Sequence, residues 1–156
     1  MTKSCDPADR VGIYKRLEDV PVHRQLSQYE SEYENRDMWA EFMDDVLLER
    51  YKTDRSVQEA ERAGRRWANH VESRGRHHAL ATPDDVEAWC QHLVDTLTLK
   101  TAYNTYWTRL ERFYTWLQWN RSHPHTYNPV LMAAIEGDAA ERIWDEKIRR
   151  GHGEGR

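Results

Sequence analysis

The stretch of residues 97–129 constrains the fold more than any other part of the chain. It reads LTLKTAYNTYWTRLERFYTWLQWNRSHPHTYNP, and its apolar and aromatic residues recur at the spacing of one helix face. This period predicts a long helix from about Leu99 to Asn120, which ends before Pro124 because a residue preceding proline is pushed out of helical geometry. Asn128-Pro129 predicts the start of another helix, since asparagine caps a helix and proline fits its first turn. The residues predicted to face inward from the long helix are Leu99, Tyr103, Tyr106, Leu110, Phe113, Tyr114 and Leu117.

Two helices are predicted upstream from the same apolar period. Asp37 can cap the first, which spans residues 37–51. The second, residues 56–75, begins at Ser56 with Glu59 three residues later, a pair that is typical of a capping box. Both helices carry an apolar stripe that can pack against the rest of a domain.

A third upstream helix and two short downstream ones complete the prediction. A Thr-Pro pair at residues 82 and 83 is a typical helix start, and this helix is expected to extend to residue 97. A short helix over 130–135 is expected to end at Gly137, and a last helix over 139–150 to follow it. The tail, GHGEGR, is expected to be disordered. The predicted core consists of Trp39, Phe42, Trp67, Trp89, Tyr106, Leu110, Phe113 and Leu117.

The composition favours one helical domain. At 156 residues the chain is long enough for one domain with a core and too short for two of ordinary size. Seven tryptophans and eight tyrosines supply most of the large rings, and the sequence has no strand pattern. We therefore predict an all-α fold, a compact bundle of four to five helices. Residues 1–35 are expected to form a partly irregular N-terminal arm, with a short helix near residues 25–33. Residues 36–135 are expected to form the domain, and residues 136–156 a C-terminal helix and tail.

Charge is distributed unevenly among the predicted helices, although the net charge is only −4. The helices at 37–51 and 84–97 are acidic, with five acids against one arginine in the first and four acids with no lysine or arginine in the second. The helices at 55–76 and 100–121 are basic, with six arginines against three glutamates and four basic residues against one glutamate. An acidic total therefore does not exclude nucleic acid as a partner.

The two basic helices place donors on the side away from their apolar stripes. A helix advances about 100° per residue, so these polar side chains project outward together. Phosphate oxygens accept hydrogen bonds from such groups, and Asn or Arg on a helix in the major groove can reach base edges. A plain solvated helix face is the alternative interpretation of each surface. The residues predicted to contact DNA are Arg55, Arg62, Arg65, Arg66, Asn69, Lys100, Thr101, Asn104, Thr105, Thr108 and Arg112.

Metal, disulfide and membrane chemistry are not indicated. Cys5 and Cys90 are too few and too far apart for a disulfide framework or a zinc site, so a reducing compartment is expected. The histidine pairs at 77–78 and at 123 and 125 lack further ligands, and no metal or other cofactor is predicted. No apolar run reaches the roughly 20 residues that a membrane helix needs, and the first residues lack the apolar segment of a secretory signal. A soluble, cytoplasmic protein is therefore expected.

Two smaller predictions concern side chains outside the basic faces. Trp116 and Trp119 are predicted to lie in the core and at its edge, and not to form a platform for stacking bases. Asp44 and Asp85 are interpreted as solvated residues on helix faces, with Asp85 also near the positive end of a helix dipole. The two acidic helices are expected to face away from DNA, so reversal of either charge is expected to have little effect on DNA binding.

Four features together resemble the core-binding domain of the tyrosine recombinases, the phage integrase family. They are the order of four helices, the Ser-x10-Trp spacing of Ser56 and Trp67, the Thr-Pro-Asp-Asp helix start, and LTLKTAYNTYWTRLERFYTWLQWN with the Asn-Pro that follows it. The resemblance covers roughly residues 35–134, and the segment YESEYENRDMWAEF is similar to haloarchaeal members. It implies two crossed helical hairpins of the SAM-like kind, forming half of a C-shaped clamp with the helices at 56–75 and 99–120 facing DNA.

The resemblance does not extend to the catalytic residues of the family. Its members carry a second domain with an arginine, a lysine, a His-x-x-Arg pair, a further His or Trp and a nucleophilic tyrosine. None of the eight histidines here is followed by arginine three residues later. We therefore expect no catalytic residues and no enzyme activity from this chain. It is expected to be a truncated integrase or a stand-alone module that binds double-stranded DNA in integration or recombination, with a recombinase catalytic domain or subunit in trans as a further candidate partner.

The alternative function is a helical protein-interaction module without DNA contact. It would use the aromatic surface of residues 99–120 and 129–135, and an exposed Trp144 or Ile148 would mark its interface. Salt-dependent binding to duplex DNA separates the two functions, because contacts to phosphates release counterions.

Overall fold

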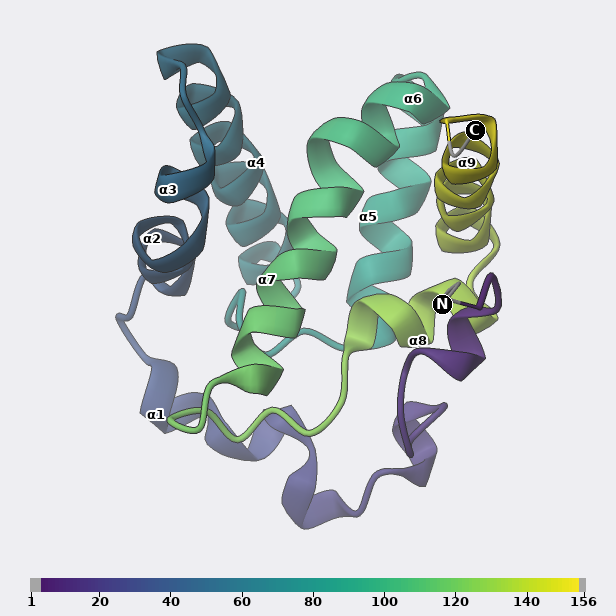
Figure 1. The fold of residues 1–156 in the computed structure, drawn as a ribbon. Helices are drawn as coiled ribbons and strands as arrows, with labels where there is room; N and C mark the ends of the chain where they lie inside the picture. Colours follow the sequence, from purple (N-terminus) through teal and green to yellow (C-terminus); the bar gives the residue numbers. More distant parts are fainter. Residues whose placement is uncertain (1–3, 155–156) are drawn as a thin grey trace.

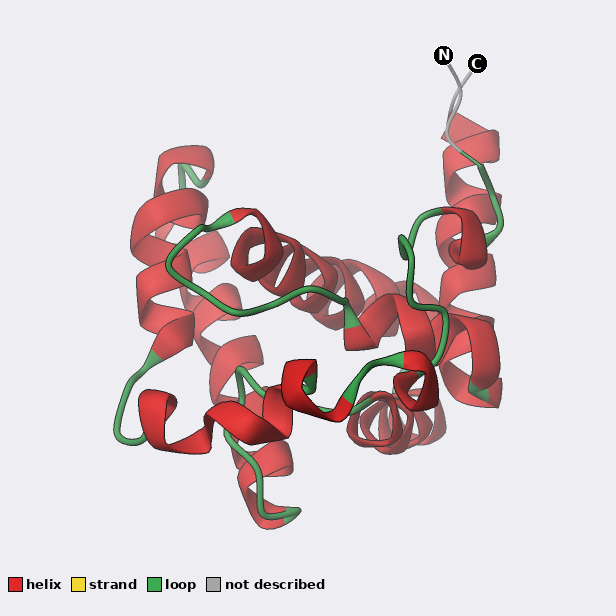
Figure 2. Cartoon of the chain, turned by 90° about the horizontal axis from the view of Figure 1, so that it is seen from below, coloured by secondary structure: helices red, strands yellow, loops and turns green. Residues whose placement is uncertain are grey.

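The computed structural model describes residues 4–154 of the chain, with side chains described as far as residue 151. All regular structure in residues 4–154 is helical and no strand occurs there (Figure 1, Figure 2), so the predicted all-α class is confirmed. Within the same range, no helix is both long and apolar enough to cross a membrane. The main elements are α2 (Met38–Phe42), η5 (Met43–Leu47), α3 (Leu48–Arg50), α4 (Asp54–Ser73), α5 (Pro83–Thr96), α6 (Leu99–Thr101), η6 (Ala102–Trp107), α7 (Thr108–Trp119), α8 (Pro129–Glu136) and α9 (Asp138–Glu154).

Two of the predicted helices each consist of three consecutive elements. α2, η5 and α3 follow one another without a break, and so do α6, η6 and α7. η5 and η6 are π turns, in which each hydrogen bond closes a wider ring than in an α-helix. A π turn holds about one extra residue, which rotates the side chains that precede it relative to those that follow. Because of this rotation Ala102 is buried, whereas Leu99 and Tyr103, both predicted to face inward, are only half-buried.

Local capping groups fix three of the helix starts as predicted. The Asp37 carboxylate accepts a hydrogen bond from the backbone N–H of Ala40 at 3.0 Å, at the start of α2. Asn128 does the same for Val130 at 2.9 Å, at the start of α8. Thr82 caps α5 in a full capping box, with Pro83 in the first turn.

The predicted start of α4 is wrong by about one turn. The capping residue is Thr53, whose hydroxyl oxygen accepts from the backbone N–H of Ser56 at 3.2 Å, and the helix begins at Asp54. Glu59 takes no part in a capping box, and its carboxylate lies 3.9 Å from the guanidinium of Arg109. The Thr53 hydroxyl thus accepts from the backbone N–H of Ser56, which the predicted capping box would have left to the Glu59 carboxylate.

Short helical turns joined by loops occupy the N-terminal part of the chain. Their apolar side chains Val11, Val20, Leu26 and Tyr33 are buried in one core with the longer helices. Leu26 is also fixed through its backbone, whose N–H donates to the hydroxyl oxygen of Tyr127 at 2.8 Å. The elements of this segment are η1 (Pro7–Asp9), η2 (Leu17–Asp19), η3 (Val22–Arg24), η4 (Leu26–Tyr29) and α1 (Glu30–Tyr33).

The last helix, α9, lies beside the start of the chain (Figure 1). The indole N–H of Trp144 donates to the carbonyl of Cys5 at 2.8 Å, and the guanidinium of Arg10 lies 5.0 Å from the Trp144 ring. Trp144 is therefore buried and does not mark an open interface. α9 runs to Glu154, beyond the predicted end at residue 150 and into the tail predicted to be disordered.

All eight side chains predicted for the core are buried. Trp39, Phe42 and Phe113 form one group of rings, with centroids 5.1–5.5 Å apart. Trp67 and Trp89 form another, with centroids 5.0 Å apart. α2 approaches α4 so closely that a Cβ at Gly64 would overlap the Trp39 indole, so a larger residue there would separate the two helices.

Replacement of Trp67 by alanine is expected to lower the free energy of unfolding by ~3–5 kcal/mol. Its ring is fully buried, and its indole N–H donates to the carbonyl of His78 at 2.9 Å, so both packing and a hydrogen bond are lost. Phe113→Ala should have a similar effect. Chemical denaturation measures both, with Trp119→Ala, an exposed tryptophan, as the matched control. Denaturation curves for the two core variants that overlay the parent curve would contradict this packing.

Candidate nucleic-acid interface

The outer face of α4 presents a row of arginines. The helix turns a stripe of small and apolar residues into the core, so the side chains on its opposite side must face solvent. Within the part of the chain that the structure describes, Arg55, Arg62 and Arg65 form no ion pair, which leaves three full positive charges available to a ligand. The exposed residues predicted here as DNA contacts are Arg55, Arg62, Arg65, Arg66 and Asn69.

Arg66 differs from the other arginines because it is held in place. Its guanidinium donates to the hydroxyl of Tyr106, and its Cζ lies 5.8 Å from the centroid of that ring. Tyr106 belongs to η6, so this contact joins the two basic helices. Arg66 is thereby fixed at the boundary between α4 and the helix that follows α5.

The second basic helix presents fewer donors than predicted. Lys100, Asn104 and Arg112 are exposed, whereas Thr101, Thr105 and Thr108 are half-buried. The Thr108 hydroxyl donates to the carbonyl of Tyr103 at 3.0 Å and therefore has no hydrogen left for a phosphate. The Thr101 hydroxyl accepts from Thr98, so its own hydrogen remains available. In the π turn at η6 the same Tyr103 carbonyl also accepts from the Thr108 backbone N–H.

Arg109 was counted among the basic residues of this helix, but it lies inside the fold. It is 7% exposed and donates to the Tyr51 hydroxyl at 2.9 Å and to the Thr105 carbonyl at 2.8 Å. Glu111, the single acid of the helix, is paired with Lys147 of α9 at 2.9 Å. The exposed positive charge of α6, η6 and α7 therefore comes from Lys100 and Arg112. Arg109 instead joins its helix to Tyr51, which follows α3, and to α4 through Glu59.

The elements carrying the predicted contacts meet at one end of the molecule. Figure 1 shows that the first turns of α4, the last turns of α5 and the whole of α6 share this end. Arg55 lies in the first turn of α4 and Lys100 lies in α6, so the two basic helices place charge at the same end. Arg112 of α7, about three turns after Lys100, is more distant from it.

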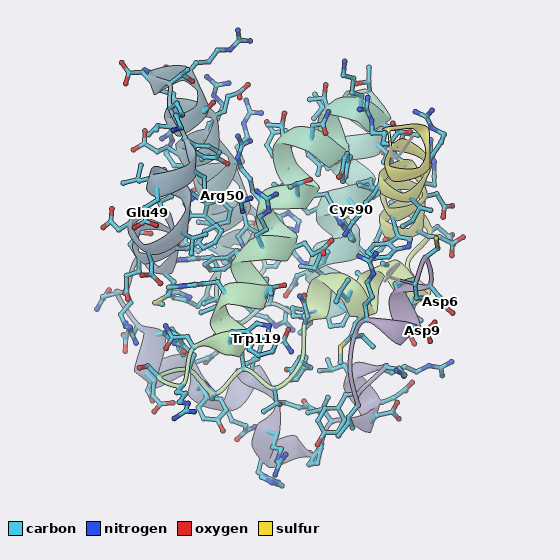
Figure 3. All side chains as sticks on the ribbon, viewed as in Figure 1. Asp6, Asp9, Glu49, Arg50, Cys90 and Trp119 are labelled. Atoms are coloured by element: carbon cyan, nitrogen blue, oxygen red, sulfur yellow. The ribbon has the colours of Figure 1, made fainter. Side chains whose placement is uncertain are left out.

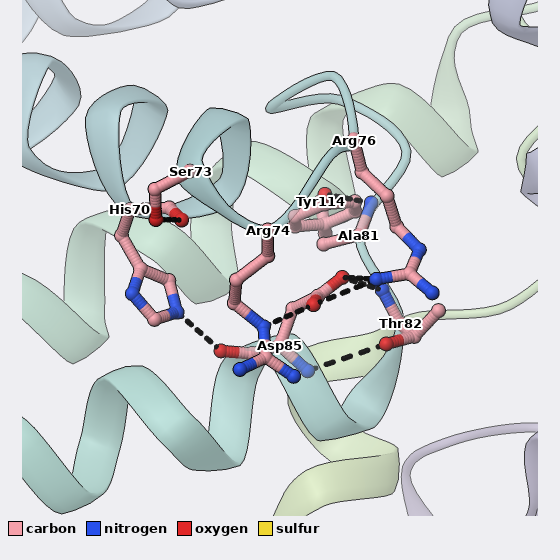
Figure 4. Close-up of polar contacts among 8 residues, drawn as sticks. All are labelled: His70, Ser73, Arg74, Arg76, Ala81, Thr82, Asp85 and Tyr114. Atoms are coloured by element: carbon pink, nitrogen blue, oxygen red, sulfur yellow. Dashed lines mark hydrogen bonds and ion pairs between the residues drawn. The ribbon is translucent and has the colours of Figure 1, made fainter.

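Arg74 and Arg76 are not part of this surface, because they pair with Asp85 (Figure 4). The Asp85 carboxylate lies 2.6 Å from Arg74 Nε and 3.0 Å from Arg76 Nη1, and it also accepts from the Thr82 backbone N–H at 2.9 Å. Asp85 has no exposed surface, so its interpretation as a solvated residue is wrong. The Thr-Pro-Asp-Asp sequence contains the signal that was missed, because its fourth residue occupies the reciprocal position of a capping box.

Four histidines gather around Tyr33, as the pairs at 77–78 and at 123 and 125 come together in space. His77, His123 and His125 have ring centroids 5.7–5.9 Å from the Tyr33 centroid, and His78 stacks on His77 at 4.1 Å. Each makes a hydrogen bond within the fold. Among the described residues, no group of three or more His, Cys, Asp or Glu side chains is arranged to hold a metal ion.

The prediction for the two tryptophans at the end of α7 holds for Trp116 only. Its indole N–H donates to Asp45 at 2.7 Å, at the edge of the core. Trp119 is 84% exposed at the lower end of α7 (Figure 3), so its placement at the core edge is wrong. The helix ends at Trp119 and the chain turns away, which leaves no element to cover the ring.

Comparison with known proteins gives no relative: no protein-family model, no curated protein and no solved structure matches this chain.

Proposed function

We propose that this chain is a duplex-DNA-binding module of the core-binding kind used by tyrosine recombinases, with a role in DNA integration or recombination. The observation that supports it most is the row of exposed arginines on α4, in a chain whose net charge is −4. Three of them form no ion pair with any residue that the structure describes. Arginine forks match phosphate oxygens, and the charge at the start of α6 extends the same surface. The resemblance of residues 35–134 to that family supports the same assignment.

The exposed amides suggest how such a surface could read sequence. Asn69 on α4 and Asn104 on η6 both project outward, and an asparagine can make paired hydrogen bonds to adenine in the major groove. The arginines would fix the register of the protein on the duplex through phosphates. Replacement of Asn104 should therefore change sequence preference more than overall affinity.

Replacement of both Arg62 and Arg66 by alanine is expected to weaken duplex binding and to flatten the slope of log affinity against log salt by up to about 2. Each lost phosphate contact removes about 0.9 from that slope, because fewer counterions are released on binding. Fluorescence anisotropy with a labelled duplex over a salt series measures it. Arg142→Ala, an exposed arginine on α9, is the matched control.

A second control accounts for the structural contact of Arg66. Tyr106→Phe removes the hydroxyl that Arg66 binds and retains the buried ring, so any effect of that contact on folding appears without loss of the charge. If the double arginine variant bound duplex DNA as the parent does at every salt concentration, the α4 surface would not be the DNA-binding face.

In this proposal the cleavage chemistry of a recombinase comes from outside these 156 residues. A catalytic domain or a subunit acting in trans is the candidate partner. The module would then supply position on the DNA and leave the reaction at the scissile phosphate to that partner.

One observation favours a second candidate, a protein-interaction module. Trp119 exposes 84% of its surface, and tryptophan is among the residues most enriched in the energetic centres of protein interfaces. Loss of a protein partner on Trp119→Ala, with duplex binding absent in the parent, would favour this candidate. Duplex binding that survives Trp119→Ala would favour the first.

A further inference from the structure

A groove of about 700 Å³ lies between α4 and α5, beside the arginine row. Its α5 wall extends from Ala88 to Leu97, and Arg66 stands on its α4 wall. The lining residues are Arg66, Asn69, His70, Ala88, Trp89, His92, Leu93, Thr96 and Leu97.

The lining of this groove contains no carboxylate. The chain has 27 Asp and Glu residues against 23 Lys and Arg, so an acid-free groove of this size is unusual within it. Three other grooves, elsewhere on the molecule, are each lined by three acids, among them Glu61, Glu34 and Glu136. The α4–α5 groove therefore suits an anionic ligand where the other three do not.

The four acids of α5 are absent from the lining of the groove. Asp85 is neutralised by two arginines, and Glu87 accepts from the backbone N–H groups of Ala139 and Ala140 at the start of α9. Asp84 lines a different groove. Asp95 accepts from Gln91 at 3.2 Å and is absent from the lining. Therefore no carboxylate of α5 competes with an anion for the donors that line this groove.

The polar and apolar parts of the groove match the repeating chemistry of a sugar–phosphate backbone. Arg66, Asn69 and His92 are exposed on its rim and carry N–H donors. Leu93 and the half-buried Leu97 provide apolar surface between the two helices. From residue 88 to residue 96 the α5 wall rises about 12 Å, a length that a short stretch of one DNA strand can follow.

We propose that one strand of duplex DNA lies along this groove, with phosphates on Arg66, Asn69 and His92 and deoxyriboses on the apolar floor. The inference rests on the proposed function and extends it, because it adds the groove-lining side of α5 to a surface predicted on the two basic helices alone. The choice of DNA over another anion rests on continuity with the arginines of α4, since Arg66 belongs to both surfaces.

Placing a carboxylate in the groove tests this inference. Asn69→Glu and His92→Glu each set a negative charge where a phosphate is expected, and each should weaken binding of a fluorescein-labelled duplex at low salt by about tenfold or more. Gln91→Glu is the matched control, because Gln91 is exposed on the same helix and is absent from the lining. It should bind as the parent does. Both positions tested are exposed, and unchanged melting temperatures would confirm that the variants fold.

The same experiment separates the groove from the proposed function. If Arg62→Ala weakens binding but both groove variants bind as the parent does, the groove inference is wrong and the DNA-binding function stands. If the parent binds no duplex at any salt concentration, both are wrong. Binding of a labelled polyglutamate peptide to the parent, with loss in both groove variants and no duplex binding, would assign the groove to an acidic protein partner and overturn the inference.

Discussion

Asp85→Lys is expected to prevent folding, and Asp85→Ala to lower the free energy of unfolding by about 3–5 kcal/mol. The carboxylate is fully buried, pairs with Arg74 and Arg76, and closes the capping box at the start of α5. Alanine removes two charge-assisted hydrogen bonds, of about 1.5–3 kcal/mol each, and one cap of about 1 kcal/mol. Both arginines are more than a third exposed, so water can hydrate them after the loss, which limits the total.

Asp85→Asn separates the contribution of the negative charge from that of the capping hydrogen bond. It retains an oxygen that can accept from the Thr82 N–H and loses the charge, so its destabilisation should be about half that of alanine. Asp84→Ala, at the exposed neighbouring position in the same first turn, is the matched control and should cost less than about 1 kcal/mol. Thermal and chemical denaturation measure all of these. Denaturation of Asp85→Ala at the parent midpoint would show that this network does not hold α5 to the end of α4.

Acidification from pH 6.5 to pH 4 is expected to destabilise the protein by about 3 kcal/mol for each of His78 and His125. Burial lowers the pKa of each ring from 6.5 to about 4, and both side chains are 5% exposed or less. The unfolded chain takes up protons below pH 6.5 that the folded state accepts only near pH 4. The stability contributed by the neutral rings is therefore complete above pH 6.5 and is lost as the pH falls toward 4.

The geometry explains why neither ring tolerates a second proton. His78 Nε2 accepts from the backbone N–H of Met38 at 3.1 Å, so protonation would set two donors against each other at the start of α2. His125 uses Nε2 to donate to the Ala79 carbonyl at 2.7 Å, and a proton on its buried Nδ1 would have no acceptor in the described fold. Burial also lowers the pKa of His77 and of His123, so protonation of these rings adds to the loss of stability as the pH falls.

Denaturation curves recorded at intervals from pH 7 to pH 4 test this prediction. His78→Gln and His125→Gln retain a polar group at a similar reach and cannot titrate, so each should reduce the loss of stability over that range. His23→Gln, at an exposed position, is the control and should follow the parent. A parent protein equally stable at pH 7 and pH 4.5 would show that these rings are hydrated in the folded state.

The positions of the helices could be predicted because their signals are local. Asp37, Thr82 and Asn128 each cap a helix through a backbone N–H two or three residues away, and proline completes two of these starts. The error at Ser56 has the same origin, since Thr53 offers an equivalent cap one turn earlier and local rules do not rank the two. The core rings could be predicted for a related reason, because the apolar residues of a helix face that packs into a core recur at the helical period.

The candidate surface was predicted less completely, because exposure depends on partners that are distant in the chain. Arg109 leaves the surface to join Tyr51, 58 residues away, and Trp116 finds an acceptor in Asp45, 71 residues away. The period of the long helix gave no indication of the π turn at η6, which turns Leu99 partly outward and engages the hydroxyl of Thr108. A single extra residue in a turn changes which side chains share a face, and sequence spacing assumes a constant turn.

The amino-acid sequence by itself determined the helical class, the starts of α2, α5 and α8, eight rings and leucines of the core, and the exposed arginines of α4. Each of these depends on short-range rules: the pitch of a helix, the caps at its ends and the burial of one face. The tertiary structure alone decided that Asp85 is buried among arginines, that Trp119 is left uncovered, and that α4 and α5 enclose an acid-free groove. These features arise where separate helices meet, and the free energy of such contacts depends on distances that sequence spacing does not specify.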